Sequence, residues 1–396
     1  MEISEERLVA NYKALVSGAG DGVTVLAVVK ADGYGHGAKV CAPVLARAGV
    51  EWLGVTDAEE GAAVRAAVAG ISEKRQPRIM VMSGLLREDA EAIVRHGLTP
   101  IVWTRQQMEW LAEAVAQRGA EPLAVHLEID TGMARQGVAP GAELRELLKW
   151  LVVQPNLRLD GIMTHFASSE VADSPLTLRQ RVRFEQAVGE VAAAGLQPVW
   201  VHAGNSSTVD NSAVSVHDPG SLVWLRSVAS GVGARAMVRC GLALYGYCLP
   251  VEGGNALVQS ELRPVMTWKT RVIGVRAVQA GDSVGYNAIF TAQRPMRLAL
   301  LPVGYADGLR RELSASDAMP GGWVMIGGRR AMIVGRVSMN LTVVDVTDIS
   351  GVSVGDEVVL LGDGVTADDH ARLAHTIAYE IVCGMRAEPR LVNAAG

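Results

Sequence analysis

Lys30 is the residue whose type and position point most directly to chemistry. It follows the apolar run Val23–Val29 and precedes the segment Ala-Asp-Gly-Tyr-Gly-His-Gly at 31–37. Apolar surroundings favour the neutral amine of a lysine, and a neutral amine can form a Schiff base with an aldehyde cofactor. For Val-Val-Lys alone, a surface lysine that closes a strand is the commoner case. Here the glycines let a ligand approach the backbone and Tyr34 adds a phenol, so we predict a cofactor site.

Further polar residues follow other apolar runs of the first 245 residues. If those runs are parallel strands of one barrel, their carboxyl ends meet on the face where barrel active sites form. Glycines and small hydroxyls after the last two strands also suit the phosphate sites that barrels often place there. A single histidine such as His165 is more often a satisfied core residue, so the prediction depends on the common placement. The segments are Asp130–Arg135, Thr164–Phe166, His202–Ser207 and Arg239–Leu242.

The elements that must position these residues alternate along the chain. Eight β-branched runs separated by helix-like segments, with a repeat of about 30 residues, are typical of a (β/α)8 TIM barrel. A doubly wound open sheet is the alternative. The expected strands are Val23–Val29, Trp52–Val55, Arg78–Met82, Thr99–Trp103, Leu123–Ile129, Leu157–Met163, Pro198–Val201 and a run ending near Arg239. The expected helices include Ala58–Ala69, Arg105–Arg118, Ala142–Val153 and Thr177–Ala194, with a helix plus an insertion in Asp210–Arg235.

The pattern changes after residue 255. Strand-like runs are separated there by Gly, Asp and Pro turns rather than by helices. These runs are Thr267–Val278, Arg297–Val303, Trp323–Ile326, Ala331–Val337, Leu341–Val346 and Glu357–Leu361, followed by one helix over Ala367–Cys383. We therefore predict an α/β plus β chain, with an N-terminal barrel domain over 1–255 and a C-terminal mostly-β domain over 256–396.

Composition excludes several classes of protein. The net charge of −5 gives no basic surface for nucleic acid or an anionic membrane, and 49% hydrophobic residues provide for a packed core. No apolar run reaches the roughly 18 residues of a membrane span, and the acidic N-terminus lacks the apolar segment of a signal peptide. Four widely spaced cysteines argue against a zinc site and a disulfide framework. We expect a cytoplasmic protein with no metal, no nucleic-acid partner and no membrane partner.

The segment around Lys30 resembles the lysine motif that binds pyridoxal 5′-phosphate in the alanine racemase family. The similarity extends over essentially the whole chain. Matches in both predicted domains make a chance resemblance hard to credit. The further matching segments are Asp130–Arg135, Thr164–Ala167, Asn205-Ser206, Met237–Gly246, Gly285–Ala292, Gly304–Gly308 and Val334–Met339.

This resemblance implies a racemase that interconverts L-alanine and D-alanine and so supplies a peptidoglycan precursor. It also implies a head-to-tail homodimer with shared active sites. By the resemblance, Lys30 forms the Schiff base and is the base on one face of the substrate, and Tyr286 of the partner subunit is the opposite base. The chemistry agrees, because racemisation needs a proton removed from one face of Cα and returned on the other.

The same resemblance implies which residues hold the cofactor and the substrate. Arg239 contacts the pyridine nitrogen, with His165 behind it. A guanidinium there does not give up its proton fully, so the ring is a weaker electron sink and side reactions are restrained. Phosphate-pocket positions are matched by Tyr34, Asn205, Ser206, Gly241, Leu242 and Tyr305, and contacts to the phenolate oxygen and the substrate carboxylate by Arg135 and Met339.

Three departures from the family pattern concern the same site. Glu128 stands where many members carry a carbamylated lysine, and it supplies a permanent negative charge beside Arg135. The usual Cys-Met-Asp triplet reads Ser-Met-Asn at 338–340. The segment Cys383–Arg390 is one residue short and lacks a tyrosine expected near Ala387, beside the substrate side-chain pocket. A broad-specificity or serine-accepting racemase is therefore the alternative within the class.

Two other classes use a similar barrel. One is a fold-type III amino-acid decarboxylase, and the other is a non-catalytic cofactor-binding barrel, which lacks a second domain. The lysine motif with its Tyr-Gly-His-Gly sequence and the candidate base Tyr286 favour the racemase over both.

Overall fold

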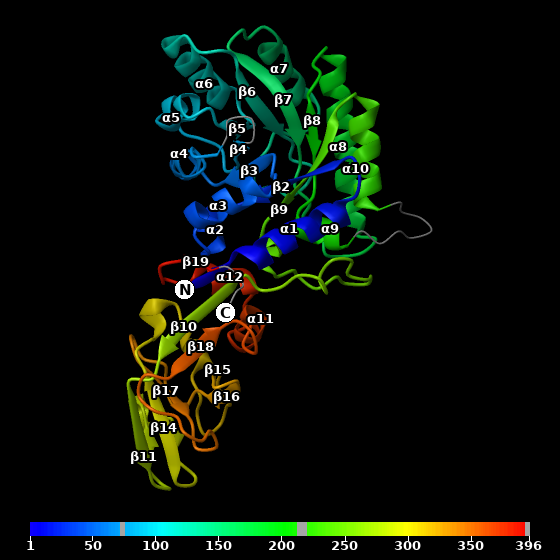
Figure 1. Ribbon diagram of the computed structural model, residues 1–396. Coiled ribbons are helices and arrows are strands. Elements are labelled where there is room, and N and C mark those ends of the chain that lie inside the picture. Colours follow the sequence, from blue (N-terminus) through cyan, green and yellow to red (C-terminus); the bar gives the residue numbers. More distant parts are fainter. Residues whose placement is uncertain (72–75, 212–219, 393–396) are drawn as a thin grey trace. The chain divides into compact units, whose positions relative to one another are not determined.

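The computed structural model describes residues 1–71, 76–211 and 220–392 (Figure 1). The chain divides into two compact units. One unit comprises Leu8–Gly33 and Ala38–Arg263, and the other comprises Met1–Arg7, Tyr34–Gly37 and Pro264–Gly396. We call them the barrel unit and the sheet unit.

Eight parallel strands close into a barrel in the barrel unit. They are β2 (Val23–Val28), β3 (Trp52–Val55), β4 (Arg78–Val81), β5 (Thr99–Val102), β6 (Leu123–Glu128), β7 (Leu157–Met163), β8 (Trp200–His202) and β9 (Arg235–Cys240). Most of their residues are buried, because a barrel core fills one face of each strand and surrounding helices cover the other. The predicted TIM barrel is confirmed, and the open sheet is excluded.

One helix precedes the first barrel strand and the others connect the barrel strands, as the predicted alternation requires. They are α1 (Glu5–Ala19), α2 (Lys30–Tyr34), α3 (Ala38–Arg47), α4 (Ala58–Ala67), α5 (Asp89–Arg95), α6 (Arg105–Arg118), α7 (Ala142–Val152), α8 (Pro175–Ala193), α9 (Ser206–Asp210) and α10 (Ser221–Gly231). Part of the insertion predicted within Asp210–Arg235 lies at 212–219, outside the described residues. Within the described ranges, no helix has both the length and the apolar character to cross a membrane.

The described residues of the sheet unit form three sheets. A six-stranded sheet has the order β16-β15-β18-β10-β1-β19, a three-stranded sheet has the order β11-β14-β17, and β12 pairs with β13. The strands are β1 (Glu2–Ser4), β10 (Met266–Arg271), β11 (Gly274–Val278), β12 (Ser283–Val284), β13 (Phe290–Thr291), β14 (Met296–Leu301), β15 (Trp323–Ile326), β16 (Arg329–Met332), β17 (Thr342–Asp345), β18 (Glu357–Leu361) and β19 (Arg390–Val392). The predicted sheet-rich C-terminal region is confirmed.

Two elements predicted as continuous are interrupted. The run Thr267–Val278 forms β10 and β11, which belong to different sheets, because the backbone N–H groups of Val272 and Ile273 bond to Asp356 and Leu300 respectively. The single helix predicted over Ala367–Cys383 is α11 (Ala367–Leu373) and α12 (Ala378–Cys383). His375 between them has φ of 53°, a left-handed conformation that a continuous α-helix does not contain.

Candidate active site

Lys30 lies directly beyond the carboxyl end of β2. Val29 at the strand end donates its N–H to Gly54 O at 2.7 Å, and the buried Tyr245 hydroxyl donates to Val28 O at 3.2 Å. These two contacts fix the backbone that carries the lysine. The structure thus places Lys30 at the end of the barrel where the sequence predicts a site, and the side chain is half-buried.

The turn after Lys30 is held in an uncommon conformation. Ala31 and Asp32 have φ of 53° and 50°, in the left-handed region that side chains other than glycine rarely adopt. The Asp32 carboxylate accepts a hydrogen bond from Ala38 N at 2.8 Å, and Asp32 N donates to Glu60 Oε1 at 3.0 Å. A residue keeps a left-handed conformation where several surrounding contacts hold it in place, and such positions are common at ligand sites.

Arg239 near the end of β9 is the centre of a buried polar cluster. Its Nη1 donates to His202 Nδ1 at 3.1 Å, and its Nη2 donates to Thr164 O at 2.8 Å and to His165 Nδ1 at 3.1 Å. A guanidinium has donors only, so Nδ1 of each histidine is the acceptor. Arg239 Nε is buried and has no hydrogen-bond partner among the described residues.

The protonation states in this cluster follow from burial and from the arginine charge. Burial, and then the charges of Arg239, Arg135 and Lys30, lower the pKa of His165 to about 3. Burial, and then His126 and Arg239, hold the pKa of His202 well below its usual range. Burial lowers the pKa of Arg239 to about 10, so it stays protonated at neutral pH. A cation flanked by neutral histidines therefore occupies this end of the barrel.

Ser206 and Gly241 come together after β8 and β9. The Ser206 hydroxyl accepts the backbone N–H of Gly241 at 3.0 Å and that of Ala243 at 3.4 Å. Asn205 caps α9 by accepting the N–H of Thr208 at 3.2 Å. Leu242 begins the short 3-10 helix Leu242–Tyr245, so the four predicted phosphate-pocket residues of the barrel unit lie on two adjoining turns.

Glu128, the last residue of β6, is buried with 2% of its surface exposed. Its carboxylate accepts a hydrogen bond from Gln136 Nε2, which also donates to Met82 O at 3.1 Å. Burial raises the pKa of Glu128, and the Gln136 hydrogen bond and the charges of Arg239 and Arg135 oppose that shift. The direct partner of Glu128 is therefore Gln136, while Arg135 acts on it through its charge.

The turn that presents Arg135 is built around one carboxylate. Asp130 Oδ1 accepts the backbone N–H groups of Gly132, Met133 and Ala134 at 2.9, 3.0 and 3.1 Å. Three converging donors hold the turn in one shape, and the Arg135 side chain is exposed beyond it. The guanidinium is thereby left available to an anionic group.

Three predicted site residues lie in the sheet unit on exposed loops. Tyr286 begins the 3-10 turn Tyr286–Ala288 and is 68% exposed, and Met339 is 57% exposed. Tyr305 N donates to Ser338 O at 3.0 Å, which joins the Tyr305 loop to the Met339 loop. A Cβ at Gly304 would lie 2.1 Å from Ser338 O, so only glycine permits this approach.

Tyr34 is buried within the sheet unit. Its ring lies 6.0 Å from that of Tyr379 on α12, at an angle of 56°. The next residue, Gly35, has φ of 78°, and a Cβ there would lie 2.2 Å from Val382 O. The glycine that follows Tyr34 in the lysine motif therefore has a structural role against α12.

The sequence interpretation did not identify four residues of this region. They are His126, Asp160, His202 as a partner of Arg239, and Gln136 as the partner of Glu128. A histidine or aspartate inside an otherwise apolar strand run is the signal that could have found the first three.

A lysine at one strand end of a closed parallel barrel suits an aldehyde cofactor, and a buried arginine Nε without a partner among the described residues suits a ring nitrogen. Pyridoxal phosphate is a cofactor of this class. The comparisons specify the class further. Residues 3–249 match the family "Alanine racemase, N-terminal domain", and residues 265–392 match "Alanine racemase, C-terminal domain". The chain belongs to the alanine racemase family.

Individual relatives cover almost the whole chain. An alanine racemase of Symbiobacterium thermophilum is 38% identical over 374 residues, covering 92% of this chain and 89% of the relative. The alanine racemase structure of Streptomyces coelicolor has 33% identity and a TM-score of 0.85, covering 100% of this chain and 97% of that one. The alanine racemase of Bartonella henselae, described with covalently bound pyridoxal phosphate, has 26% identity and a TM-score of 0.80, covering 99% and 98%.

Proposed function

We propose that this protein is a pyridoxal phosphate-dependent alanine racemase, which interconverts L-alanine and D-alanine. The observation that carries the proposal is the buried Nε of Arg239, a donor without a hydrogen-bond partner among the described residues. It stands at the strand ends of a barrel whose chain matches the racemase family in both of its domains. A ring nitrogen that accepts this hydrogen bond satisfies the donor, so the residues fit the cofactor.

When bound, pyridoxal phosphate withdraws electrons from Cα of an attached amino acid, which makes the Cα proton removable. Arg239 would hold the ring nitrogen, and its guanidinium keeps its proton, since its pKa of about 10 is well above neutrality. The neutral His165 accepts from Arg239 and adds no second positive charge. Arg239 and His165 would thus limit the electron withdrawal by the cofactor ring to what the proposed racemisation needs.

Two bases of the chain carry the proton transfers. In one direction Lys30 Nζ removes the Cα proton and the Tyr286 hydroxyl supplies a proton to the opposite face. In the other direction the roles are exchanged. One proton leaves carbon and one returns, so the substrate and product differ only in configuration.

The remaining predicted residues bind and orient. Backbone N–H groups and hydroxyls suit a phosphate, and a cation suits the phenolate oxygen or the substrate carboxylate. We assign the phosphate to Tyr34, Asn205, Ser206, Gly241, Leu242 and Tyr305, and the phenolate oxygen and substrate carboxylate to Arg135 and the backbone at Met339. Glu128 supports Arg135 through its negative charge.

The domain roles and the assembly belong to the same proposal. Residues 1–255 hold the cofactor, and residues 256–396 supply Tyr286 to the partner subunit of a head-to-tail homodimer. The exposure of Tyr286 and Met339 in the single chain supports this assignment, because exposed apolar and phenolic side chains are available to a second subunit. We place the protein in the cytoplasm, and the four cysteines, which are thiols in the structure, agree with a reducing compartment.

Racemisation of a panel of L-amino acids and of D-alanine by the purified chain with pyridoxal phosphate tests the function. Chiral chromatography follows both directions. We expect equal amounts of L-alanine and D-alanine at equilibrium, with alanine the fastest substrate. A faster reaction with serine selects the broad-specificity alternative, release of carbon dioxide selects the decarboxylase, and no turnover overturns the proposal.

A further inference from the structure

A chain of buried polar side chains runs through the barrel interior from Arg239 to Asp160. Beyond the contact between Arg239 and His202, His202 Nε2 lies 2.7 Å from His126 Nδ1. His126 Nε2 in turn lies 3.5 Å from Asp160 Oδ2. All four side chains are almost fully buried, with at most 2% of their surface exposed.

The Arg239 end of this chain fixes the arrangement of its protons, and the charge of Asp160 favours the same arrangement. Arg239 has only donors, so His202 Nδ1 must accept and His202 must carry its proton on Nε2. His126 Nδ1 must then accept from His202, which leaves the His126 proton on Nε2, facing Asp160. At 3.5 Å this contact is an electrostatic one rather than a hydrogen bond, and the negative charge of an ionised Asp160 favours an N–H group on the facing side of the ring. If His202 carried its proton on Nδ1 instead, that N–H group would face an N–H group of Arg239.

We propose that His126 and Asp160 are positioning residues that fix the tautomer of His202 and thereby hold Arg239 in the orientation that presents its Nε to the cofactor ring. This inference rests on the proposed function for the role of Arg239. His126 and Asp160 touch neither the substrate nor the reacting atoms, and they act through His202 alone.

The backbone of β6 and β7 provides space for these buried polar side chains. The register between β6 and β7 shifts between Val125 and His126, which pair with Leu159 and Gly161, so Asp160 is the extra residue of a β-bulge. Bulges redirect a side chain out of the regular alternation. A Cβ at Gly161 would lie 2.4 Å from His126 Nδ1, so glycine makes room for the imidazole ring.

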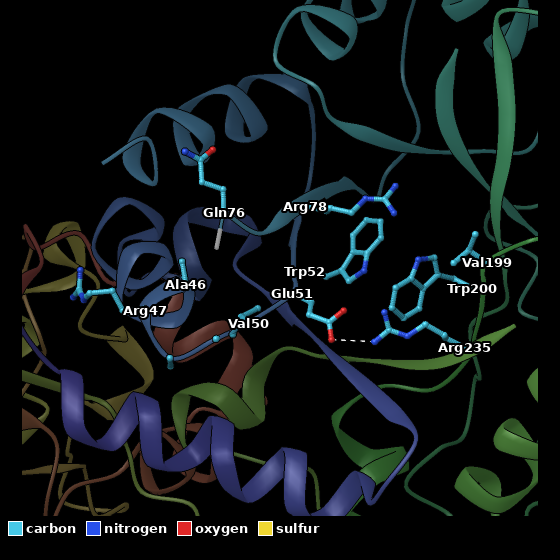
Figure 2. A pocket seen from close by; sticks show the side chains of 12 residues that line it. Ala46, Arg47, Val50, Glu51, Trp52, Gln76, Arg78, Val199, Trp200 and Arg235 are labelled. Atoms are coloured by element: carbon cyan, nitrogen blue, oxygen red, sulfur yellow. Dashed lines mark hydrogen bonds and ion pairs between the residues drawn. The ribbon is translucent and has the colours of Figure 1, made fainter. Parts of the chain in front are cut away.

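Aromatic and cationic side chains line a pocket at the amino ends of the barrel strands (Figure 2). The Trp52 and Trp200 rings meet edge to face at 5.7 Å, and the Trp52 ring packs against the His126 ring at 5.3 Å. Arg78 lies over Trp52 at 4.0 Å and Arg235 over Trp200 at 4.2 Å, at the amino ends of the strands. Trp52 therefore lines the pocket and also contacts His126, and both histidines are fully buried.

Arg78 also forms an ion pair with Asp160. Its Nη1 lies 2.7 Å from Asp160 Oδ2, and Arg158 pairs with the other carboxylate oxygen. Burial by itself would raise the pKa of Asp160, but the nearby His126 ring and the charge of Arg78 hold it well below its usual range. Burial lowers the pKa of His126 as well, although Asp160 opposes that shift. An anionic aspartate and two neutral histidines agree with the proton arrangement that the geometry requires.

The test measures the tautomers directly, in the full chain labelled with 15N-histidine, prepared with and without pyridoxal phosphate. We expect His126 and His202 both as Nε2–H tautomers that do not titrate between pH 6 and 8. An imidazolium or an Nδ1–H tautomer at His202 overturns the proposal. This readout needs no variant and no turnover, so a chain with these tautomers but without racemase activity contradicts the proposed function and not the tautomer assignment.

Two variants test the coupling to the cofactor. In His126→Leu, His202 loses its acceptor, and we expect a changed His202 15N pattern and a dissociation constant for pyridoxal phosphate raised about 10-fold, as for other outer partners of a site. Trp52→Phe is the matched control, because it changes packing on His126 and removes no member of the chain. It should preserve both quantities. An unchanged His202 pattern and cofactor affinity in His126→Leu would overturn the proposal.

Discussion

Gln136 donates its side-chain amide both to the buried carboxylate of Glu128 and to the backbone oxygen of Met82. The amide therefore satisfies one carboxylate oxygen and ties the turn that carries Arg135 to the strand end at Met82. The second influence on Glu128 is electrostatic, from Arg239 and Arg135. Glu128 thus interacts with two cations through charge, and Gln136 rather than Arg135 is its hydrogen-bond partner.

Replacement of Glu128 by Gln should weaken substrate binding while the cofactor stays bound. The variant keeps a hydrogen-bonding side chain but removes the charge that attracts Arg135, so we expect KM for alanine to rise about 10-fold. Steady-state kinetics and cofactor absorbance measure the two effects. Glu146→Gln, at an exposed glutamate on α7, is the matched control and should leave KM unchanged. Wild-type kinetics in Glu128→Gln would make Glu128 a bystander.

The response of the activity to bicarbonate is a separate prediction for Glu128. Because Glu128 already provides the negative charge of a carbamylated lysine, added bicarbonate should leave the wild-type activity unchanged. Glu128→Lys should regain activity only when bicarbonate is present. Activation of the wild type by bicarbonate, or a bicarbonate-independent Glu128→Lys enzyme, would contradict this view of Glu128.

Replacement of Lys30 by Ala should abolish covalent attachment of pyridoxal phosphate, because the amine that forms the bond is removed. Borohydride reduction followed by peptide mass spectrometry should locate the adduct on Lys30 in the wild type and find none in the variant. Lys39→Ala, an exposed lysine on α3, is the control and should behave as wild type. An adduct on another lysine would refute the assignment.

Replacement of Tyr286 by Phe should reduce the racemisation rate by about 10²–10⁴-fold, the usual range for a lost general acid or base. The substrate isotope effects should change differently in the two directions, since each base serves one face. Mixed dimers of Lys30→Ala and Tyr286→Phe chains should regain part of the activity if subunits share sites. Hybrid dimers that form but stay inactive would argue against sharing.

Stability should fall on acidification because His165 is neutral in the fold. The unfolded state takes up a proton below about pH 6.5, but the folded state does so only near the pKa of about 3. The free energy of unfolding therefore decreases as pH falls between these values, by up to about 1.4 kcal/mol per pH unit, and His165 adds almost no slope above about pH 7.5. Urea unfolding from pH 5 to 8 should show a shallower slope for His165→Gln than for the control His96→Gln. Equal slopes would contradict this.

Replacement of Gly35 by Ala should destabilise the protein more than the same change at Gly49. Both glycines have positive φ, so both variants carry backbone strain of about 1–2 kcal/mol. At Gly49 a Cβ meets no atom within 4 Å, whereas at Gly35 it would lie 2.2 Å from Val382 O. Urea unfolding midpoints compare the two. Similar losses would show that α12 adjusts easily.

The barrel, the second sheet-rich region and the position of Lys30 could all be predicted from the residues in order along the chain. These depend on local information: the period of apolar residues, the turns between them, and one lysine at the end of a buried run. Because parallel strands end on one face of a barrel, the same pattern predicted that Lys30, His165 and Arg239 lie on that face.

The tertiary structure alone decided which polar side chains meet inside the barrel. His126 and His202 are separated by 76 residues, and their contact depends on a bulge at Asp160 and on the absence of a side chain at Gly161. Likewise, Gln136 rather than Arg135 reaches Glu128 because the Asp130 turn sets the direction of the chain. Periodicity specifies which face of a strand is buried, but the pairing of buried polar groups depends on register, ring orientation and tautomer, which only the closed barrel fixes.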